Sequence, residues 1–142
     1  MNRSPLTILL TIKGRPTYTK RWLDYMSLIQ FEHNIIIADG DADGYTKELI
    51  ENKSYTELNI DFFEYRQTVN YIDYYKMIVA AIERAQSDYV MLCDNDDFLL
   101  PSGTNKILSF LKKNPDHISR GGYITGFILN GGTSVDYGSS FR

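Results

Sequence analysis

An uninterrupted apolar segment that runs directly into three closely spaced carboxylates constrains this chain most. The segment is Tyr89–Cys93, and it is followed by Asp94, Asp96 and Asp97. An apolar run of this length, bounded by polar residues, predicts a strand buried on both faces of a parallel sheet. In open α/β sheets, ligands bind just beyond the carboxyl ends of such strands. The three aspartates therefore stand where a binding site is expected.

Three carboxylates held this close together repel one another. At ~4 Å and an effective dielectric constant of ~20, each close pair costs on the order of 4 kcal/mol, and a bound divalent cation relieves that cost. Because the ligands are all oxygens, the pattern predicts a hard ion, Mg²⁺ or Mn²⁺, that shares its other positions with water and substrate phosphates. The alternative is a solvated acidic turn before the next helix, since Asp and Asn are common turn residues.

The composition restricts the class of protein. A length of 142 residues suits one domain, and 43% hydrophobic with 23% charged residues is typical of an ordinary globular protein. A net charge of −3 gives no electrostatic reason to expect nucleic-acid binding. The single cysteine, Cys93, excludes an internal disulfide framework, and the N-terminal apolar run 6–12 is too short to span a membrane. These features predict a cytoplasmic protein without a membrane span.

Hydrophobic periodicity predicts strands that alternate with helices along the whole chain. We expect strands at 6–12, 34–38, 58–65, 89–93 and 122–129, and helices at about 17–29, 45–52, 70–86 and 101–113, the last of which begins at Pro101. Two of the helices have apolar residues that we expect to be buried: Trp22, Leu23, Met26 and Ile29 on the first, and Tyr71, Tyr75, Ile78, Val79 and Ile82 on the third. This βαβαβαβαβ order predicts an α/β fold with a Rossmann-like, mostly parallel sheet and flanking helices. The chain stops soon after its fifth expected strand, so we expect one domain over 1–142 that corresponds to the first part of a larger, truncated fold.

Two of the expected strands end in motifs that resemble the GT-A glycosyltransferases, specifically family 2. Residues 35–44, IIIADGDADG, are similar to that family's hydrophobic strand running into Asp-Asp-Gly-Ser-x-Asp-Gly, and residues 91–97, MLCDNDD, resemble its Leu-Asp-x-Asp-Asp. The resemblance covers about residues 5–130 and implies a nucleotide-diphospho-sugar transferase-like fold. Two features depart from the family pattern. Ala38 replaces the first of the paired aspartates, and the first strand is not followed by the usual Pro-x-Tyr-Asn.

The resemblance implies a role for each aspartate. Asp39 would accept a hydrogen bond from the nucleobase, typically uracil. Asp96 would bind a Mn²⁺ or Mg²⁺ ion that bridges the two phosphates of a nucleotide-sugar. Asp94 would lie near the ribose or a metal-bound water, and Asp97 near the sugar. The ion would act as a Lewis acid on the nucleoside diphosphate leaving group. For Asp39 a turn-forming role is the alternative.

Basic residues near the expected strand ends are candidate phosphate ligands. These are Lys13 and Arg15 after the first strand, Arg66 after the third, and Lys76 on the third helix; for each, solvent exposure without a ligand is the alternative. The resemblance implies that the catalytic base is an Asp or Glu of an acceptor-binding second half that is absent here, so the catalytic residue is unknown. The expected partners are a nucleotide-sugar donor, UDP-linked by resemblance, and a saccharide, lipid or protein acceptor of unknown identity.

Other functions compete with the donor-binding part of a glycosyltransferase. A phosphoacceptor signalling domain would need paired acids after the first strand, where this chain has Lys13-Gly14-Arg15. A nucleotidyltransferase would need a glycine-rich loop there. A non-catalytic interaction or carbohydrate-recognition module with the same fold stays open, and metal-dependent nucleotide binding would separate it from the enzyme.

Overall fold

The computed structural model describes residues 4–41, 44–52, 55–65 and 68–119, together with the backbone of 127–130 and 134–137. The chain divides into two compact units, Met1–Leu99 and Leu100–Arg142. Among the described residues, the first unit contains a four-stranded parallel sheet, and the second contains one helix and a two-stranded antiparallel sheet.

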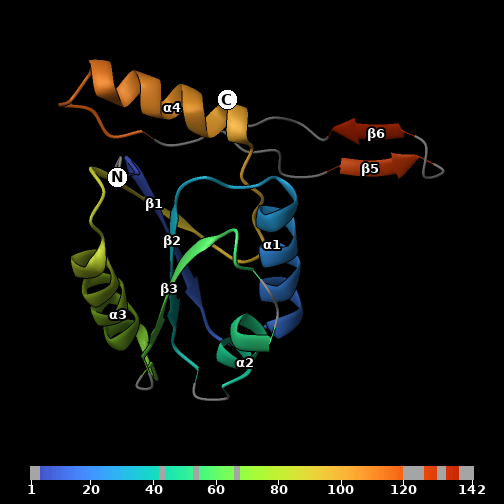
Figure 1. Ribbon diagram of the computed structural model, residues 1–142, viewed down its shortest axis with the longest axis vertical. Helices are drawn as coiled ribbons and strands as arrows, with labels where there is room; N and C mark the ends of the chain where they lie inside the picture. Colours follow the sequence, from blue (N-terminus) through green and yellow to red (C-terminus); the bar gives the residue numbers. More distant parts are fainter. Residues whose placement is uncertain are drawn as a thin grey trace. The chain divides into compact units, whose positions relative to one another are not determined.

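The first unit is a Rossmann-like α/β structure, as the sequence predicted (Figure 1). Its strands lie in the spatial order β3-β2-β1-β4, and all neighbours are parallel. Figure 1 shows α3 on one side of this sheet and α1 and α2 on the other. The elements are β1 (Leu6–Ile12), α1 (Pro16–Leu28), β2 (Asn34–Asp39), α2 (Tyr45–Asn52), β3 (Asn59–Glu64), α3 (Tyr71–Arg84) and β4 (Tyr89–Cys93).

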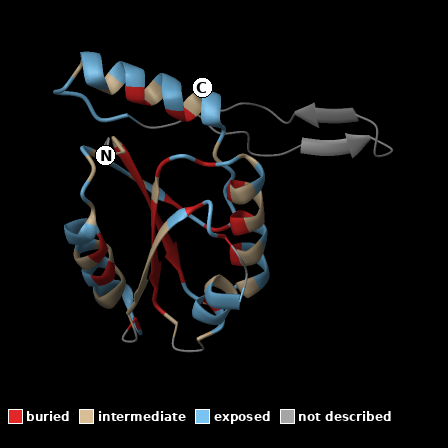
Figure 2. Ribbon diagram, in the orientation of Figure 1, coloured by how far each residue is buried: buried red, intermediate tan, exposed pale blue. Residues whose placement is uncertain are grey.

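The core of this unit lies on both faces of β1, which is buried along its whole length (Figure 2). On one face, Leu9 and Ile36 pack against Met77 and Ala81 of α3. On α1, the predicted apolar stripe is confirmed for three of its residues, since Trp22, Leu23 and Met26 are fully buried. A strand without one exposed residue needs neighbours on both edges and cover on both faces, and β1 has them.

The prediction that β4 is buried on both faces is wrong. β4 pairs with β1 alone in the described sheet and therefore forms its edge. Val90 and Leu92 are 38% and 55% exposed. Leu92 is paired in register with Leu9, so it lies on the face that α3 covers. Because α3 packs over β1 and β2, its cover stops short of the outermost strand.

The α3 helix forms as predicted, but it packs through a different face. Asn70 caps it, and its side-chain oxygen accepts a hydrogen bond from the backbone N–H of Asp73 at 3.0 Å. The buried residues are Met77 and Ala81, whose small or flexible side chains allow close approach to the sheet. Four residues of the apolar repeat identified in the sequence are exposed instead: Tyr71, Tyr75, Val79 and Ile82.

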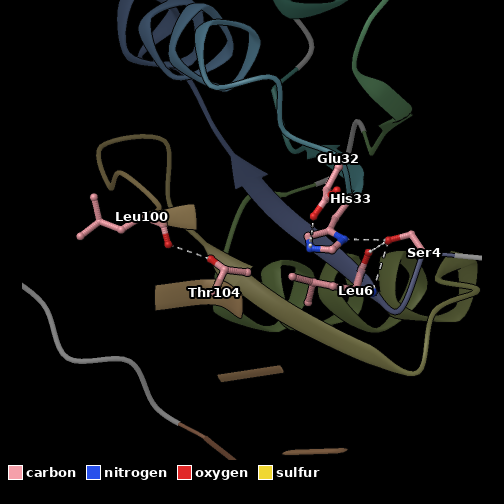
Figure 3. A network of polar contacts seen from close by, with 6 residues as sticks. All are labelled: Ser4, Leu6, Glu32, His33, Leu100 and Thr104. Atoms are coloured by element: carbon pink, nitrogen blue, oxygen red, sulfur yellow. Dashed lines mark hydrogen bonds and ion pairs between the residues drawn. The ribbon is translucent and has the colours of Figure 1, made fainter. Parts of the chain in front are cut away.

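A polar network joins the amino ends of β1 and β2 (Figure 3). The Ser4 hydroxyl donates to the carbonyl of Leu6 at 3.0 Å and lies 3.1 Å from Nδ1 of His33. The His33 ring is buried, and its Nε2 lies 3.9 Å from a carboxylate oxygen of Glu32. This network gives His33 a structural position at the edge opposite to the strand ends that carry the acidic motifs.

The second unit begins with α4 (Pro101–Lys113), which starts at the predicted proline and buries Thr104 and Leu108. The Thr104 hydroxyl donates to the carbonyl of Leu100 at 3.3 Å (Figure 3). β5 (Phe127–Asn130) pairs with β6 (Ser134–Tyr137) in antiparallel fashion, so the expected fifth strand does not extend the described parallel sheet. Residues 122–126 of that expected strand lie outside the described residues, and β6 was not predicted. No helix among the described residues has the length and apolar character to cross a membrane.

Candidate functional site

The candidate site is the edge of the sheet where β1, β2 and β4 end. The strands of the four-stranded sheet are parallel, so their carboxyl ends meet at this edge, and the sheet order reverses direction between β1 and β4. Ligands of open α/β sheets bind at such a switch point. Three segments follow these strand ends, namely 13–15, 39–41 and 94–97.

The segment after β1 has an unusual backbone. Gly14 and Arg15 are both left-handed, with φ of 64° and 55°. Pro16 then opens α1, and the carbonyl of Arg15 accepts hydrogen bonds from the N–H groups of Tyr18 and Thr19 at 3.0 and 3.2 Å. A non-glycine residue in this conformation is strained by about 1–3 kcal/mol. The backbone of Arg15 is therefore held by the start of α1.

The side chain of Arg15 reaches the acidic segment after β4. Its Nη1 donates to Oδ2 of Asp96 at 2.7 Å, although the two residues are 81 positions apart in sequence. The Arg15 and Asp96 side chains are 55% and 45% exposed. The structure thus brings together two residues predicted for the site, one as a phosphate ligand and one as a metal ligand.

The segment after β2 is tightly packed. Asp39 is only 2% exposed, and its Oδ1 accepts a hydrogen bond from the N–H of Asp41 at 2.9 Å. The N–H of Gly40 donates to the carbonyl of Ile12 at 2.9 Å, which ties this turn to the end of β1. The Asp41 carboxylate lies close to Gly14, since a Cβ built on that glycine would be 3.6 Å from its Oδ2. The nucleobase contact of Asp39 stays a prediction.

The acidic segment after β4 is a turn that is anchored through its second residue. The N–H of Asp97 donates to the carbonyl of Asp94 at 3.2 Å. Asn95 is buried and donates through Nδ2 to the hydroxyl of Thr19 on α1 at 3.0 Å. Asp94 and Asp96, on either side of it, are exposed. A role for Asn95 was not predicted, and its place between two aspartates was the only signal in the sequence.

Aromatic contacts hold the rest of this loop on α1. The Arg21 guanidinium lies over the rings of Tyr18 and Phe98, at 4.8 and 5.3 Å from their centroids. The ring of Tyr25 meets Phe98 edge to face at 4.8 Å, and its hydroxyl donates to the carbonyl of Leu99 at 2.7 Å. These residues were not predicted for the site. Their spacing on α1 places them on one helix face next to the acidic loop.

Burial and like charges set the electrostatics of this loop. Desolvation raises the pKa of Asp97, and the carboxylates of Asp94 and Asp96 raise it further. Burial also raises the pKa of the Cys93 thiol to about 12, although the neighbouring Trp22 indole N–H acts in the opposite direction. Cys93 is therefore a protonated core residue, whereas the aspartates form a region of excess negative charge.

The exposed carboxylates of the loop have the chemistry of ligands for a divalent cation. In the described part of the chain, no three His, Cys, Asp or Glu side chains are grouped closely enough to hold a metal ion by themselves. Mg²⁺ and Mn²⁺ commonly bind through one or two carboxylates, and water and phosphate oxygens complete the coordination. The exposed carboxylates of Asp94 and Asp96 offer such a donor set, and the repulsion felt by Asp97 favours a cation there.

The remaining basic candidates lie in different places. The ammonium group of Lys13 donates to the carbonyl of Thr68 at 2.5 Å, which holds it at the strand ends. Lys76 is exposed on α3 and lines a shallow groove of about 400 Å³ that is formed by α3 residues alone, so it is not brought to the strand ends. Arg66 lies outside the described residues.

Comparison with known proteins decides the family. The model of the family described as glycosyl transferase family 2 matches residues 20–134. The chain belongs to glycosyl transferase family 2. This confirms the resemblance carried by the two strand-end motifs. No curated protein matches the sequence.

Solved structures support the fold of this family 2 chain. It is similar to the crystal structure of S. aureus TarS 1–349, with a TM-score of 0.58, 14% identity and coverage of 76% of this chain and 32% of the other. A second S. aureus TarS structure gives a TM-score of 0.61, 15% identity and coverage of 78% and 20%. The chain thus spans about a third and a fifth of the length of these structures, and the predicted GT-A-like α/β fold is confirmed.

Proposed function

We propose that this family 2 chain binds a nucleotide-sugar donor, together with a divalent cation, at the carboxyl ends of β1, β2 and β4. One observation carries the proposal: the cationic segment after β1 contacts the acidic segment after β4 at the switch point of the sheet, through Arg15 and Asp96. A diphosphate with a bound cation needs both kinds of charge within a few ångströms. Membership of the family supports a role in glycosyl transfer.

Each residue of the site has a proposed part in donor binding. Asp96, with Asp94 directly or through water, would hold Mn²⁺ or Mg²⁺, and the ion would supply Lewis-acid chemistry for a nucleoside diphosphate leaving group. Lys13 and Arg15 pair with the phosphates, and Asp97 orients the sugar. Asp39 accepts a hydrogen bond from the nucleobase, which we propose is uracil. Lys76 is a weaker candidate for the phosphates, because its groove on α3 contains no strand-end residue.

The transfer step also needs a base and an acceptor. In line with the family resemblance, we place the base, an Asp or Glu, in an acceptor-binding region beyond these 142 residues. We assign no described carboxylate to this role. The isolated chain is therefore expected to bind the donor and to transfer poorly.

Thermal unfolding with ligands tests the proposal. The melting temperature is measured with UDP, GDP, CMP and ADP, each with and without Mn²⁺. A ligand at ~100 times its Kd stabilises the fold by ~2.7 kcal/mol, which corresponds to a shift of several degrees, at roughly 2–8 °C per kcal/mol. We expect a shift with UDP that requires Mn²⁺, is lost in Asp96→Asn and persists in Asp116→Asn, a matched change at an exposed aspartate of the second unit.

Two results would contradict the proposal. The absence of a shift with every nucleotide, in a protein that unfolds cooperatively, would exclude a donor site in this chain. A shift with free saccharides but with no nucleotide would instead support the carbohydrate-recognition module. A shift with GDP, CMP or ADP in place of UDP would keep the donor site and correct the nucleobase.

A further inference from the structure

We infer that Arg15 is an internal counter-ion of the donor site: it pairs with Asp96 in the free protein, gives up this carboxylate to the divalent cation, and then pairs with the donor phosphates. The inference rests on the proposed donor site and adds an exchange of partners to it. The exchange couples the binding of the divalent cation to the binding of the donor phosphates through Arg15.

The contact geometry makes the two cations competitors. Nη1 of Arg15 lies 2.7 Å from Oδ2 of Asp96, so this oxygen already has a charge-assisted hydrogen bond. A cation that coordinates the same carboxylate would lie within a few ångströms of the guanidinium, and the two positive charges would repel each other. Oδ1 of Asp96 accepts no hydrogen bond from Arg15, but an ion bound there would still lie close to the guanidinium, so in the present arrangement each cation weakens the binding of the other to Asp96.

The backbone of Arg15 is fixed, whereas the tip of its side chain can change partners. The left-handed backbone, Pro16 and the hydrogen bonds to the first turn of α1 hold the main chain in place. The side chain is 55% exposed, and its other contact is a distant one, with the guanidinium carbon 5.8 Å from the centre of the Tyr18 ring. A guanidinium that leaves Asp96 thus stays tethered at the same strand end.

The surroundings favour phosphate as the second partner. Arg15 immediately precedes α1, whose first turn contains no acidic residue, so the helix terminus adds positive potential at this point. The planar guanidinium matches phosphate oxygens through paired hydrogen bonds. Lys13 lies two residues away, with its ammonium group held at the carbonyl of Thr68. A diphosphate that arrives with the cation would therefore meet a released guanidinium.

The exchange predicts opposite effects of one substitution on two ligands. Exposed ion pairs of this kind change an equilibrium by a factor of about 1.4–5. Without nucleotide, Arg15→Gln should therefore bind Mn²⁺ more tightly than the unmodified chain, by a factor of about 1.4–5. With Mn²⁺ at saturation, the same variant should bind UDP at least about ten-fold more weakly, because a charged hydrogen bond to phosphate is lost.

Titration of the full chain separates the possible outcomes. Mn²⁺ binding is measured by electron paramagnetic resonance of the free ion, and UDP binding by calorimetry at saturating Mn²⁺. The matched control is Arg84→Gln, since Arg84 forms an equally short and similarly exposed ion pair with Asp61 at 2.7 Å. This control should bind both ligands as the unmodified chain does. Arg15→Asn, which tolerates the left-handed backbone, checks that strain at residue 15 does not cause the effect.

Each result has a defined meaning. Tighter Mn²⁺ binding and weaker UDP binding in both Arg15 variants support the exchange. Unchanged or weaker Mn²⁺ binding in these variants overturns it, even if Asp96→Asn abolishes Mn²⁺ binding and the donor site is thereby upheld. If the unmodified chain binds neither Mn²⁺ nor UDP, the proposed function fails, and the exchange fails with it.

Discussion

Gly40, the residue after β2, allows the sharpest test of how the site is packed. A Cβ built on Gly40 would lie 2.7 Å from Oγ1 and 2.9 Å from Cβ of Thr68, and 3.3 Å from Sδ of Met77. Contacts below 3.0 Å force atoms to move. Thr68 is buried, and its carbonyl accepts the hydrogen bond from Lys13, so it cannot move without loss of contacts. Overpacking of this kind costs about 1–3 kcal/mol, and we expect that destabilisation for Gly40→Ala.

Two other glycines provide matched controls for the same added methyl group. Gly103 lies within α4, and its added Cβ would meet only the Cβ of Leu100, at 3.9 Å. Gly103→Ala should therefore stabilise α4 by up to ~1 kcal/mol through helix propensity. Gly44 has open space around it but a φ of 71°, so Gly44→Ala should cost about 1–2 kcal/mol through backbone strain alone.

Urea unfolding measures these differences. The fluorescence of Trp22, which is the only tryptophan and is fully buried, reports on the first unit, and far-UV circular dichroism reports on the helices. We expect the urea midpoint of Gly40→Ala to fall, and part of the loss to be recovered in Gly40→Ala/Thr68→Ala, which removes the 2.7 Å contact but leaves the 2.9 Å one. A Gly40→Ala variant as stable as the unmodified chain would refute the close packing between the turn after β2 and Thr68.

Four further predictions concern Cys93, Tyr55 and Arg84, which lie outside the binding loops or are buried beneath them. Because its pKa is raised to about 12, Cys93 should react with a maleimide at pH 8 at least about a thousand-fold more slowly in the folded chain than in urea; labelling at equal rates would contradict its burial. Its raised pKa also implies that folding stability falls as the pH rises from about 9 toward 12, where only the unfolded thiol is ionised, and Cys93→Ala should remove this contribution from a pH series of unfolding curves. Tyr55→Phe removes a 2.8 Å hydrogen bond to Asp24 and should lower the unfolding free energy by about 1.5–3 kcal/mol. Arg84→Ala breaks an exposed ion pair with Asp61 and should cost no more than ~1 kcal/mol in the same assay, so a loss larger than that of Tyr55→Phe would be unexpected.

The sequence predicted the elements of the first unit better than their surroundings. Continuous β-branched and leucine runs were sufficient to identify β1 and β2, and the four-residue repeat was sufficient to place α1 and α3. The same reasoning failed for the burial of β4 and for the packed face of α3. Periodicity records which residues share a face, but it does not record how many neighbours a strand has or where a covering helix stops. The exposure of Leu92 and Tyr75 depends on those facts.

The candidate site was likewise predictable only in part. Aspartates at strand ends were predictable, because a parallel sheet gathers its carboxyl ends at one edge. The pairing of Arg15 with Asp96 was not, since it requires β1 and β4 to be neighbours in the sheet, and the sequence does not specify strand order. The hydrogen bond from Asn95 to Thr19 was not predicted for the same reason. Both contacts join loops that are far apart in sequence, and neither has a local signature.

The left-handed backbone at Arg15 has a consequence for protein engineering. Glycine or asparagine would adopt a φ of 55° at lower cost, so a screen that selects only for thermal stability should favour their appearance at residue 15. The same replacements delete the guanidinium that reaches Asp96. Residue 15 is therefore a position where selection for a more stable protein and selection for ligand binding should favour different amino acids. Arginine at this position is a compromise in which the chain accepts local strain and keeps a charge at the end of its central strand.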